Sequence, residues 1–187
     1  QKQVGGLVAA FAAIGVGRFV TNTQRATNQM IDFSKRIGDT TENLSAFVFA
    51  AEATGIAVNS STIALQRQTR RIGEAAQGFG EASDAIKQLG LNAKELSQLT
   101  PTAAFDKISE SLQGIDNQSV KIATAFKLWD TEGVALVQTL DEIAKFKQLA
   151  VDTGAIVDAQ EAAAARDIRD AFTVLRAEAQ AFGQTFL

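Results

Sequence analysis

The chain has 187 residues, a length that suits one domain or two small ones, and 46% of them are hydrophobic, which is enough to build a core. It contains no cysteine and no histidine. Those absences exclude a disulfide scaffold, a zinc site with thiolate or imidazole ligands, and catalysis by a histidine base or a cysteine nucleophile. The net charge of −3 does not indicate a nucleic-acid-binding protein. With 33 alanines against one proline, the composition favours an all-α chain. The missing histidine and cysteine lead us to expect that the chain is not an enzyme and carries no cofactor or metal.

The N-terminal region, residues 1–38, begins with an apolar stretch and then keeps a regular pattern. Residues 4–17 carry no charge, but Arg18 ends this run before the roughly 20 residues that a membrane-spanning helix needs. Apolar residues recur at alternating spacings of three and four on both sides of Arg18, which predicts one long helix over residues 3–37. This first heptad seam consists of the apolar residues Ala9, Ala12, Val16, Phe19, Ala26, Met30, Phe33 and Ile37, with Thr23 as the only polar residue in the alternation, between Phe19 and Ala26.

We expect the first seam to pack against a partner helix or a second copy of the chain. The alternative is a membrane-active helical module, for example a pore or a translocation device, that uses residues 4–20. These two readings differ in what covers the apolar surface, since one needs protein and the other needs lipid.

The middle region, residues 39–156, predicts a set of short helices separated by glycines. Glycine commonly ends a helix, and here it stands at positions 38, 55, 78, 80, 90 and 114. No stretch alternates apolar and polar residues as a half-buried strand would, so we predict no strands.

Several helix starts are also visible in the middle region. Thr100-Pro101 is the clearest, because threonine can cap a helix and proline at the first helical position loses no hydrogen bond. Asn92 and Asn117 are expected to cap further helices. Residues 39–42 (Asp-Thr-Thr-Glu) have the spacing of a capping box that opens at the aspartate. Ser60 or Ser61 is expected to cap the helix that follows residue 55.

The helix after Asn117 and the helix after Thr131 each carry apolar residues that we expect to face the core. For the first of them these residues are Val120, Ile122, Ala123, Phe126 and Leu128. For the second they are Val134, Val137 and Leu140, in a helix that continues or kinks towards Leu149.

Arg67, Arg70 and Arg71 form a basic cluster in the middle region, and their spacing places them on one helix face. Such a face can bind phosphate, but no aromatic residues are interleaved and Glu74 follows on the same face. We therefore predict a solvent-exposed stripe with a local ion pair. Other chemical motifs are missing: glycine pairs complete no dinucleotide fingerprint, and no phosphate-binding Gly-Lys-Ser/Thr sequence occurs.

The C-terminal region, residues 157–187, predicts a second long helix with a coiled-coil-like seam. Its apolar residues again alternate in spacings of three and four over about three heptads. This second heptad seam consists of Ala165, Ile168, Phe172, Leu175, Ala179, Phe182 and Phe186. Phenylalanine at three of these positions suits a core wider than that of a two-stranded coil, so a trimer is one expectation. The alternative is that this helix packs on the middle region of the same chain.

From residue 38 onwards the chain resembles the tail tape measure proteins of long-tailed bacteriophages and related prophages. The resemblance rests on the order and spacing of four blocks, each of which is degenerate by itself. The first block is GDTTENLSAF (residues 38–47) with AAEATGI (50–56), and the second is GEAA (73–76) with AIKQLGLNAKEL (85–96). The third is Thr100-Pro101 with Phe105, and the fourth is AFKLWDTEGVAL (125–136). Many members of the family have Phe-Gly where this chain has Trp129-Asp130.

The resemblance implies a structural virion protein that sets tail length, fills the tail tube or tip, and is released during DNA ejection. It implies no catalytic residues. The partners that it implies are other copies of the chain, tail tube and tail tip proteins, an assembly chaperone, and the host membrane at ejection. It also implies a location in the virion tail, with the host cytoplasm during assembly. We expect a fragment of a longer protein, elongated and oligomeric, in which the glycine-rich middle is a compact end module.

Overall fold

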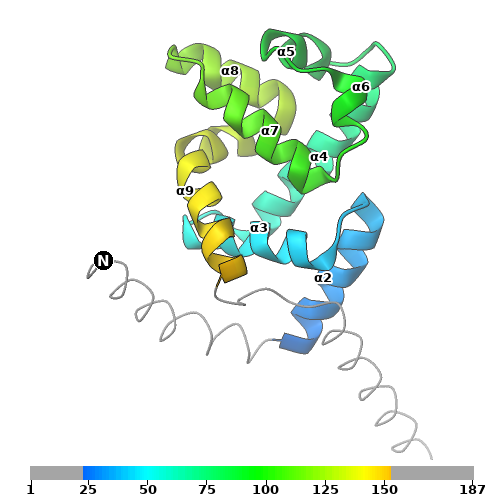
Figure 1. The fold of residues 1–187 in the computed structure, drawn as a ribbon, viewed down its shortest axis with the longest axis vertical. Coiled ribbons are helices and arrows are strands. Elements are labelled where there is room, and N and C mark those ends of the chain that lie inside the picture. The colour runs from blue at the N-terminus through cyan, green and yellow to red at the C-terminus, as the bar shows by residue number, and fades with distance from the viewer. Residues whose placement is uncertain (1–22, 153–187) are drawn as a thin grey trace, which may run out of the picture. The chain divides into compact units, whose positions relative to one another are not determined.

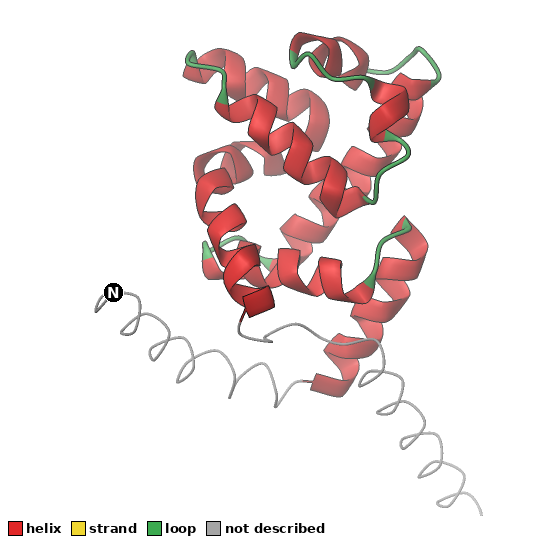
Figure 2. Cartoon of the chain, viewed as in Figure 1, coloured by secondary structure: helices red, strands yellow, loops and turns green. Residues whose placement is uncertain are grey.

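The structure is a computed structural model that describes residues 23–152, with side chains described from residue 29. Within this range the chain forms eight helices and no strand, so the all-α prediction is confirmed for the described residues (Figures 1 and 2). The helices are α2 (Thr23–Ile37), α3 (Thr41–Ala53), α4 (Val58–Ala76), α5 (Ala82–Gln88), α6 (Ala93–Leu96), α7 (Pro101–Gln113), α8 (Gln118–Trp129) and α9 (Glu132–Asp152). Residues 33–156 make up one compact unit, and the contacts described below lie within it.

Most of the two predicted seams lies outside the described residues. The seam residues from Ala9 to Phe19, the whole second seam and the apolar stretch at residues 4–20 all lie outside the described residues. In α2 the helix over residues 23–37 ends just before Gly38, as predicted. Its seam residues Met30, Phe33 and Ile37 are half-buried, whereas Ile31 and Ser34 are buried.

Helix α4 is the centre of the unit, because it contacts every helix from α3 to α9 (Figure 1). Its buried positions recur at spacings of three and one, which is the pattern of a stripe along one helix face. They are Ser61, Ala64, Leu65, Gln68, Arg71, Ile72 and Ala75. Two members of this stripe, Gln68 and Arg71, are polar residues that face the core and need partners there.

Three of the predicted helix starts are confirmed. The side chains of Asn92, Thr100 and Asn117 accept hydrogen bonds from backbone N–H groups in the first turns of α6, α7 and α8. Pro101 stands at the first position of α7. These starts depend on neighbouring residues alone, which is why the sequence is sufficient to locate them.

Two predicted starts are wrong. Helix α3 is capped by Thr40, whose Oγ1 accepts from the Asn43 N–H at 3.1 Å, and not by Asp39. The Asp39 Oδ2 atom instead accepts from the backbone N–H and the hydroxyl of Thr102 at 2.8 and 2.7 Å, while its Oδ1 accepts from the Thr40 N–H at 2.8 Å, so Asp39 joins the start of α3 to α7. Helix α4 begins at Val58 without a side-chain cap, and the buried Ser61 hydroxyl donates to the Val58 carbonyl inside the helix.

Glycines end the helices as predicted, and Gly55 shows the geometry. Its φ of +87° lies in the left-handed region, where a side chain is strained. The Gly55 N–H donates to the Glu52 carbonyl and the Ile56 N–H to the Ala51 carbonyl, both at 2.9 Å, which is the Schellman arrangement. The reversal places Ile56 in the core, with only 8% of its surface exposed.

The predicted apolar face of α8 is only partly correct. Leu128 is buried as predicted, but Val120 and Phe126 are exposed, and the face that α8 buries consists of Thr124, Ala125, Leu128 and Trp129. In α9, Val137 and Leu140 are buried as predicted, whereas Val134 is exposed. Helix α8 is apolar on more than one side, so its pattern did not determine which side faces inward; the packing of α9 on α8 does.

Helix α9 runs from Glu132 to Asp152 as one helix. Of the two predicted alternatives, a helix that continues towards Leu149 is therefore confirmed. Its approach to α8 is close at Gly133. A Cβ atom at this position would lie 2.8 Å from the Ala125 carbonyl oxygen, so only glycine fits here.

Candidate functional site: the corner between α8 and α9

Only Asp130 and Thr131 separate α8 from α9, and Asp130 has an unusual backbone conformation. Its φ of 63° and ψ of −141° make it the one described non-glycine residue with positive φ. These angles are close to those of the first central residue of a type II′ turn, a position that glycine dominates. A side chain held there costs about 1–3 kcal/mol, which the surrounding contacts must offset.

The Asp130 carboxylate faces arginines of α4. Its Oδ2 atom lies 3.4 Å from Arg71 Nη2 and 3.9 Å from Arg67 Nη1, while Oδ1 accepts from the Thr131 N–H at 3.0 Å. A glycine would relieve the backbone strain but would bring no charge. The aspartate is therefore the counter-charge of Arg67 and Arg71 on α4.

Arg71 is buried, with 7% of its side chain exposed. Its Nη1 donates to the Phe126 carbonyl at 2.9 Å, and its Nη2 lies 3.4 Å from both Asp130 Oδ2 and Glu81 Oε2. The Phe126 carbonyl also accepts from the Asp130 N–H at 2.8 Å, so Arg71 binds the last turn of α8 directly. The predicted solvent-exposed stripe is thus wrong at Arg71, because its acidic partners come from distant segments.

The other two arginines differ from Arg71 and from each other. Arg70 is exposed and pairs with Glu74 one turn later, as predicted. Arg67 is half-buried and pairs with Glu132, whose Oε2 also accepts from the Thr131 hydroxyl at 3.1 Å. Arg67 therefore binds the first turn of α9, on the opposite side of the corner from Arg71's contact with α8.

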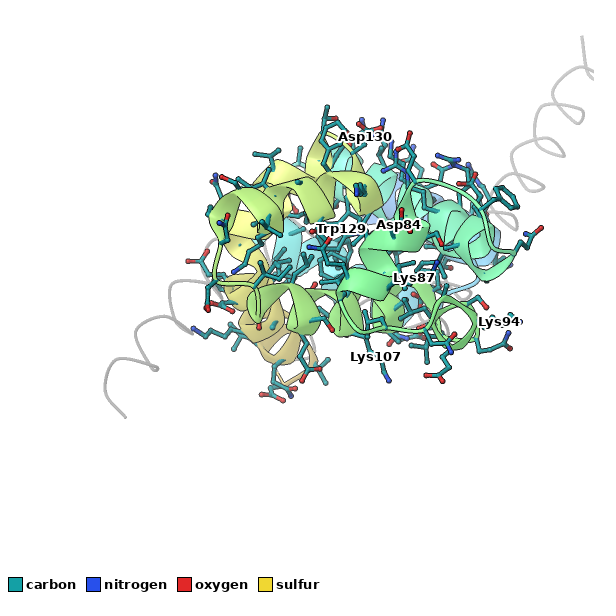
Figure 3. All side chains as sticks on the ribbon, turned by 90° about the horizontal axis from the view of Figure 1, so that it is seen from above. Asp84, Lys87, Lys94, Lys107, Trp129 and Asp130 are labelled. Atoms are coloured by element: carbon teal, nitrogen blue, oxygen red, sulfur yellow. The ribbon has the colours of Figure 1, made fainter. Side chains whose placement is uncertain are left out.

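Gln68 stands between the two inner arginines on α4 and binds the corner from inside. Its Oε1 accepts from the indole N–H of Trp129 at 2.8 Å, and its amide nitrogen donates to the Pro101 carbonyl at 2.8 Å. Gln68 and Trp129 have no exposed surface, and Figure 3 shows Trp129 among the helices and Asp130 at their edge. One amide thus satisfies two buried groups on two different helices.

The Trp129 ring continues into an aromatic row. Its centroid lies 5.1 Å from that of Phe105 on α7, which lies 4.8 Å from Phe47 on α3 in an edge-to-face arrangement at 69°. Phe47 and Phe105 are also almost fully buried. Such pairs add about 0.5–1.5 kcal/mol each beyond the area that they bury.

Only part of this site could be predicted from the sequence. The arginine cluster was visible, but its partners Asp130 and Glu132 lie about 60 residues later, and no local pattern joins them to α4. One signal was available in the sequence: two acidic residues, Asp130 and Glu132, stand on either side of Thr131, directly after the chain's single tryptophan. What the arrangement can do is hold a strained corner at three points by direct contacts.

Within residues 23–152, no helix has the length and apolar character needed to cross a membrane. The same range contains no group of three or more acidic, cysteine or histidine side chains placed to hold a metal ion. No protein-family model, curated protein or solved structure matches the chain.

Proposed function

We propose that the chain is a segment of a tail tape measure protein of a long-tailed phage or prophage, a structural virion protein without catalytic activity. It would help to set tail length, occupy the tail tube or tip, and leave during DNA ejection. The observation that carries the proposal is the meeting of the four blocks in one core. Phe47 of the first block, Phe105 of the third and Trp129 of the fourth form the aromatic row.

The second block belongs to the same core. Its GEAA segment is the last turn of α4, and its longer segment covers α5, the turn at Gly90 and α6. Helix α4 contacts both α5 and α6. The segments that carry the resemblance are therefore the ones that cap and pack the unit, which gives their order a physical reason.

The fourth block adds a more specific argument. At the position of Asp130 many family members have glycine, and the backbone there has angles that glycine adopts without strain. Gly133, which lies in the same block, is required by the approach to Ala125. A sequence departure from the family thus falls on a backbone conformation that the family's residue suits better, which supports the correspondence.

A helix advances about 1.5 Å per residue, so the length of a helical chain can measure a tube. The unit at residues 33–156 folds back on itself, since α3 packs against α9. We therefore assign it to an end module of the tape measure. The measuring stretch, the self-association through the two seams, and the contacts with tube, tip and chaperone proteins belong to the same proposal.

The test is an in-frame deletion of residues 39–152 in the genome that encodes the chain. We expect loss of infectious particles, with tails absent or unable to deliver DNA, in electron micrographs and plaque assays. The matched control is Gln66→Ala, an exposed position on α4, which should leave particles normal.

Infectious particles with unchanged tails after the deletion would overturn the proposal, as would an encoding locus without tail tube genes. Tails shortened by about 170 Å, the helical length of the deleted residues, would instead support a tape measure but overturn the end-module assignment.

A further inference from the structure

The corner between α8 and α9 has the properties of a two-state joint. Only two residues separate the two helices, and residues 118–152 contain no proline that would prevent a continuous helix. A change of the Asp130 φ and ψ from 63° and −141° to helical values would let the backbone continue from α8 into α9. We propose that the corner is a conformational switch between this bent state and a straight state in which residues 118–152 form one helix.

The bent state is held by α4 at the corner and by the packing of α9 on α3 beyond it. At the corner, Arg71 binds the end of α8, Arg67 binds the start of α9, and Gln68 binds Trp129. Together these contacts attach both sides of the turn at Asp130 to one helix. The backbone of Asp130 opposes them, because a helical conformation would remove its strain.

Gly133 biases the switch towards the bent state. It admits the close approach to the Ala125 carbonyl, where a Cβ would lie 2.8 Å from the oxygen. Gly133 is helical in the bent state too, because it lies inside α9, so the bias comes from this close approach and not from helix propensity. Because the straight state is longer, tension along the chain favours it, and its formation separates the packed faces of α8 and α9 next to Trp129. This inference does not depend on the proposed function.

The experiment measures one distance within the full 187-residue chain. The chain has no cysteine, so Ser119→Cys with Lys145→Cys gives two specific spin-label sites, both exposed and near the outer ends of α8 and α9. A straight helix places these positions about 39 Å apart along its axis, and any bend makes the separation shorter. Labelled chains are diluted with unlabelled protein, so that only distances within one chain contribute to the double electron–electron resonance signal.

Two substitutions should favour the straight state in this background. Gly133→Ala excludes the bent state by contact with a backbone carbonyl, and Asp130→Ala removes the charge while keeping the backbone strain. We expect both to move the main distance to about 39 Å and to shift Trp129 emission to the red. The matched variant is Asp130→Gly, which also removes the charge but suits the bent backbone, and it should keep the short distance.

A short distance retained in both alanine variants would overturn the proposal. So would a broad distance distribution with loss of helical circular dichroism, because that result means unfolding and not straightening. A straight distance in Asp130→Gly would also overturn it, since the switch would then depend on charge alone.

Discussion

Gln68 shows how one side chain can specify the packing of this protein. A glutamine in a core is unfavourable unless both ends of its amide are satisfied. Here one end meets the only tryptophan of the chain and the other meets the carbonyl of the only proline, on α8 and α7. These two partners fix the rotation of α4, because no neighbouring residue of α4 could bind them in its place.

We predict that Gln68→Ala lowers the free energy of unfolding by about 1–3 kcal/mol. The substitution leaves the Trp129 indole N–H buried without its partner, and such a group costs about 1–3 kcal/mol, whereas the Pro101 carbonyl belongs to the first turn of α7 and keeps its place in the helix. Urea unfolding followed by Trp129 fluorescence measures the change. Gln66→Ala, at an exposed position two residues earlier, should change it by less than about 0.5 kcal/mol. Equal effects of the two substitutions would contradict this role of Gln68.

The neighbouring arginines give a second prediction at this scale. Arg71→Ala should destabilise the protein by about 1.5–3 kcal/mol, the contribution of a hydrogen bond that involves a charged group. Arg70→Ala should cost only about 0.3–0.5 kcal/mol, since its pair with Glu74 is a surface contact one turn apart. Thermal unfolding of the two variants separates the buried arginine from the exposed one. A larger loss of stability for Arg70→Ala than for Arg71→Ala would contradict the stabilising role of the buried Arg71.

At the scale of the helices, termini were the part that the sequence predicted best. Thr100-Pro101, Asn92 and Asn117 work through bonds within one turn, so no distant residue can alter them. Asp39 shows the limit of this reasoning. Its Oδ1 atom binds the Thr40 N–H locally, but its Oδ2 atom binds two donors of Thr102 on α7, which no local pattern indicates.

Two glycines offer a matched test of helix boundaries. Gly55→Ala should destabilise the protein by about 1 kcal/mol or more, because a left-handed φ of +87° is strained for alanine. Gly73→Ala should stabilise it by about 0.5–1 kcal/mol, since this glycine lies inside α4 and a Cβ there meets open space. Chemical denaturation of both variants gives the two signs. Stabilisation by Gly55→Ala would mean that α3 does not end at this residue.

At the scale of the whole molecule, the sequence predicted the class of the fold but not its packing. The glycine breaks and the apolar residues indicated short helices, as observed. The buried face of α8 and the burial of Arg71 depend on how several helices pack together, and no local pattern contains that packing. Val120 and Phe126 were assigned to the core for this reason: several faces of α8 are apolar, and the helices packed against α8, with α9 the most extensive, distinguish between them.

The proposed self-association belongs to this scale as well. We expect the full chain to sediment as a species larger than one 19.8 kDa copy, through the second heptad seam. Phe172→Asp places a charge within that seam and should shift the protein to a monomer. Thr173→Asp, one residue outside the seam, should leave the larger species intact. A monomeric parent chain at all concentrations would contradict the prediction.

The contact of α3 with α9, the most extensive between two helices of the unit, has a consequence for synthesis. Helix α3 is complete once Ala53 has been added, but its partner is complete only at Asp152, about 100 residues later. At roughly 5–20 residues per second, a ribosome needs about 5–20 seconds to make that intervening chain. During this interval the part of α3 that packs against α9 has no α9 to cover it. Helix α3 is therefore the segment of the unit at which a chaperone acting on the nascent chain has the longest opportunity to bind.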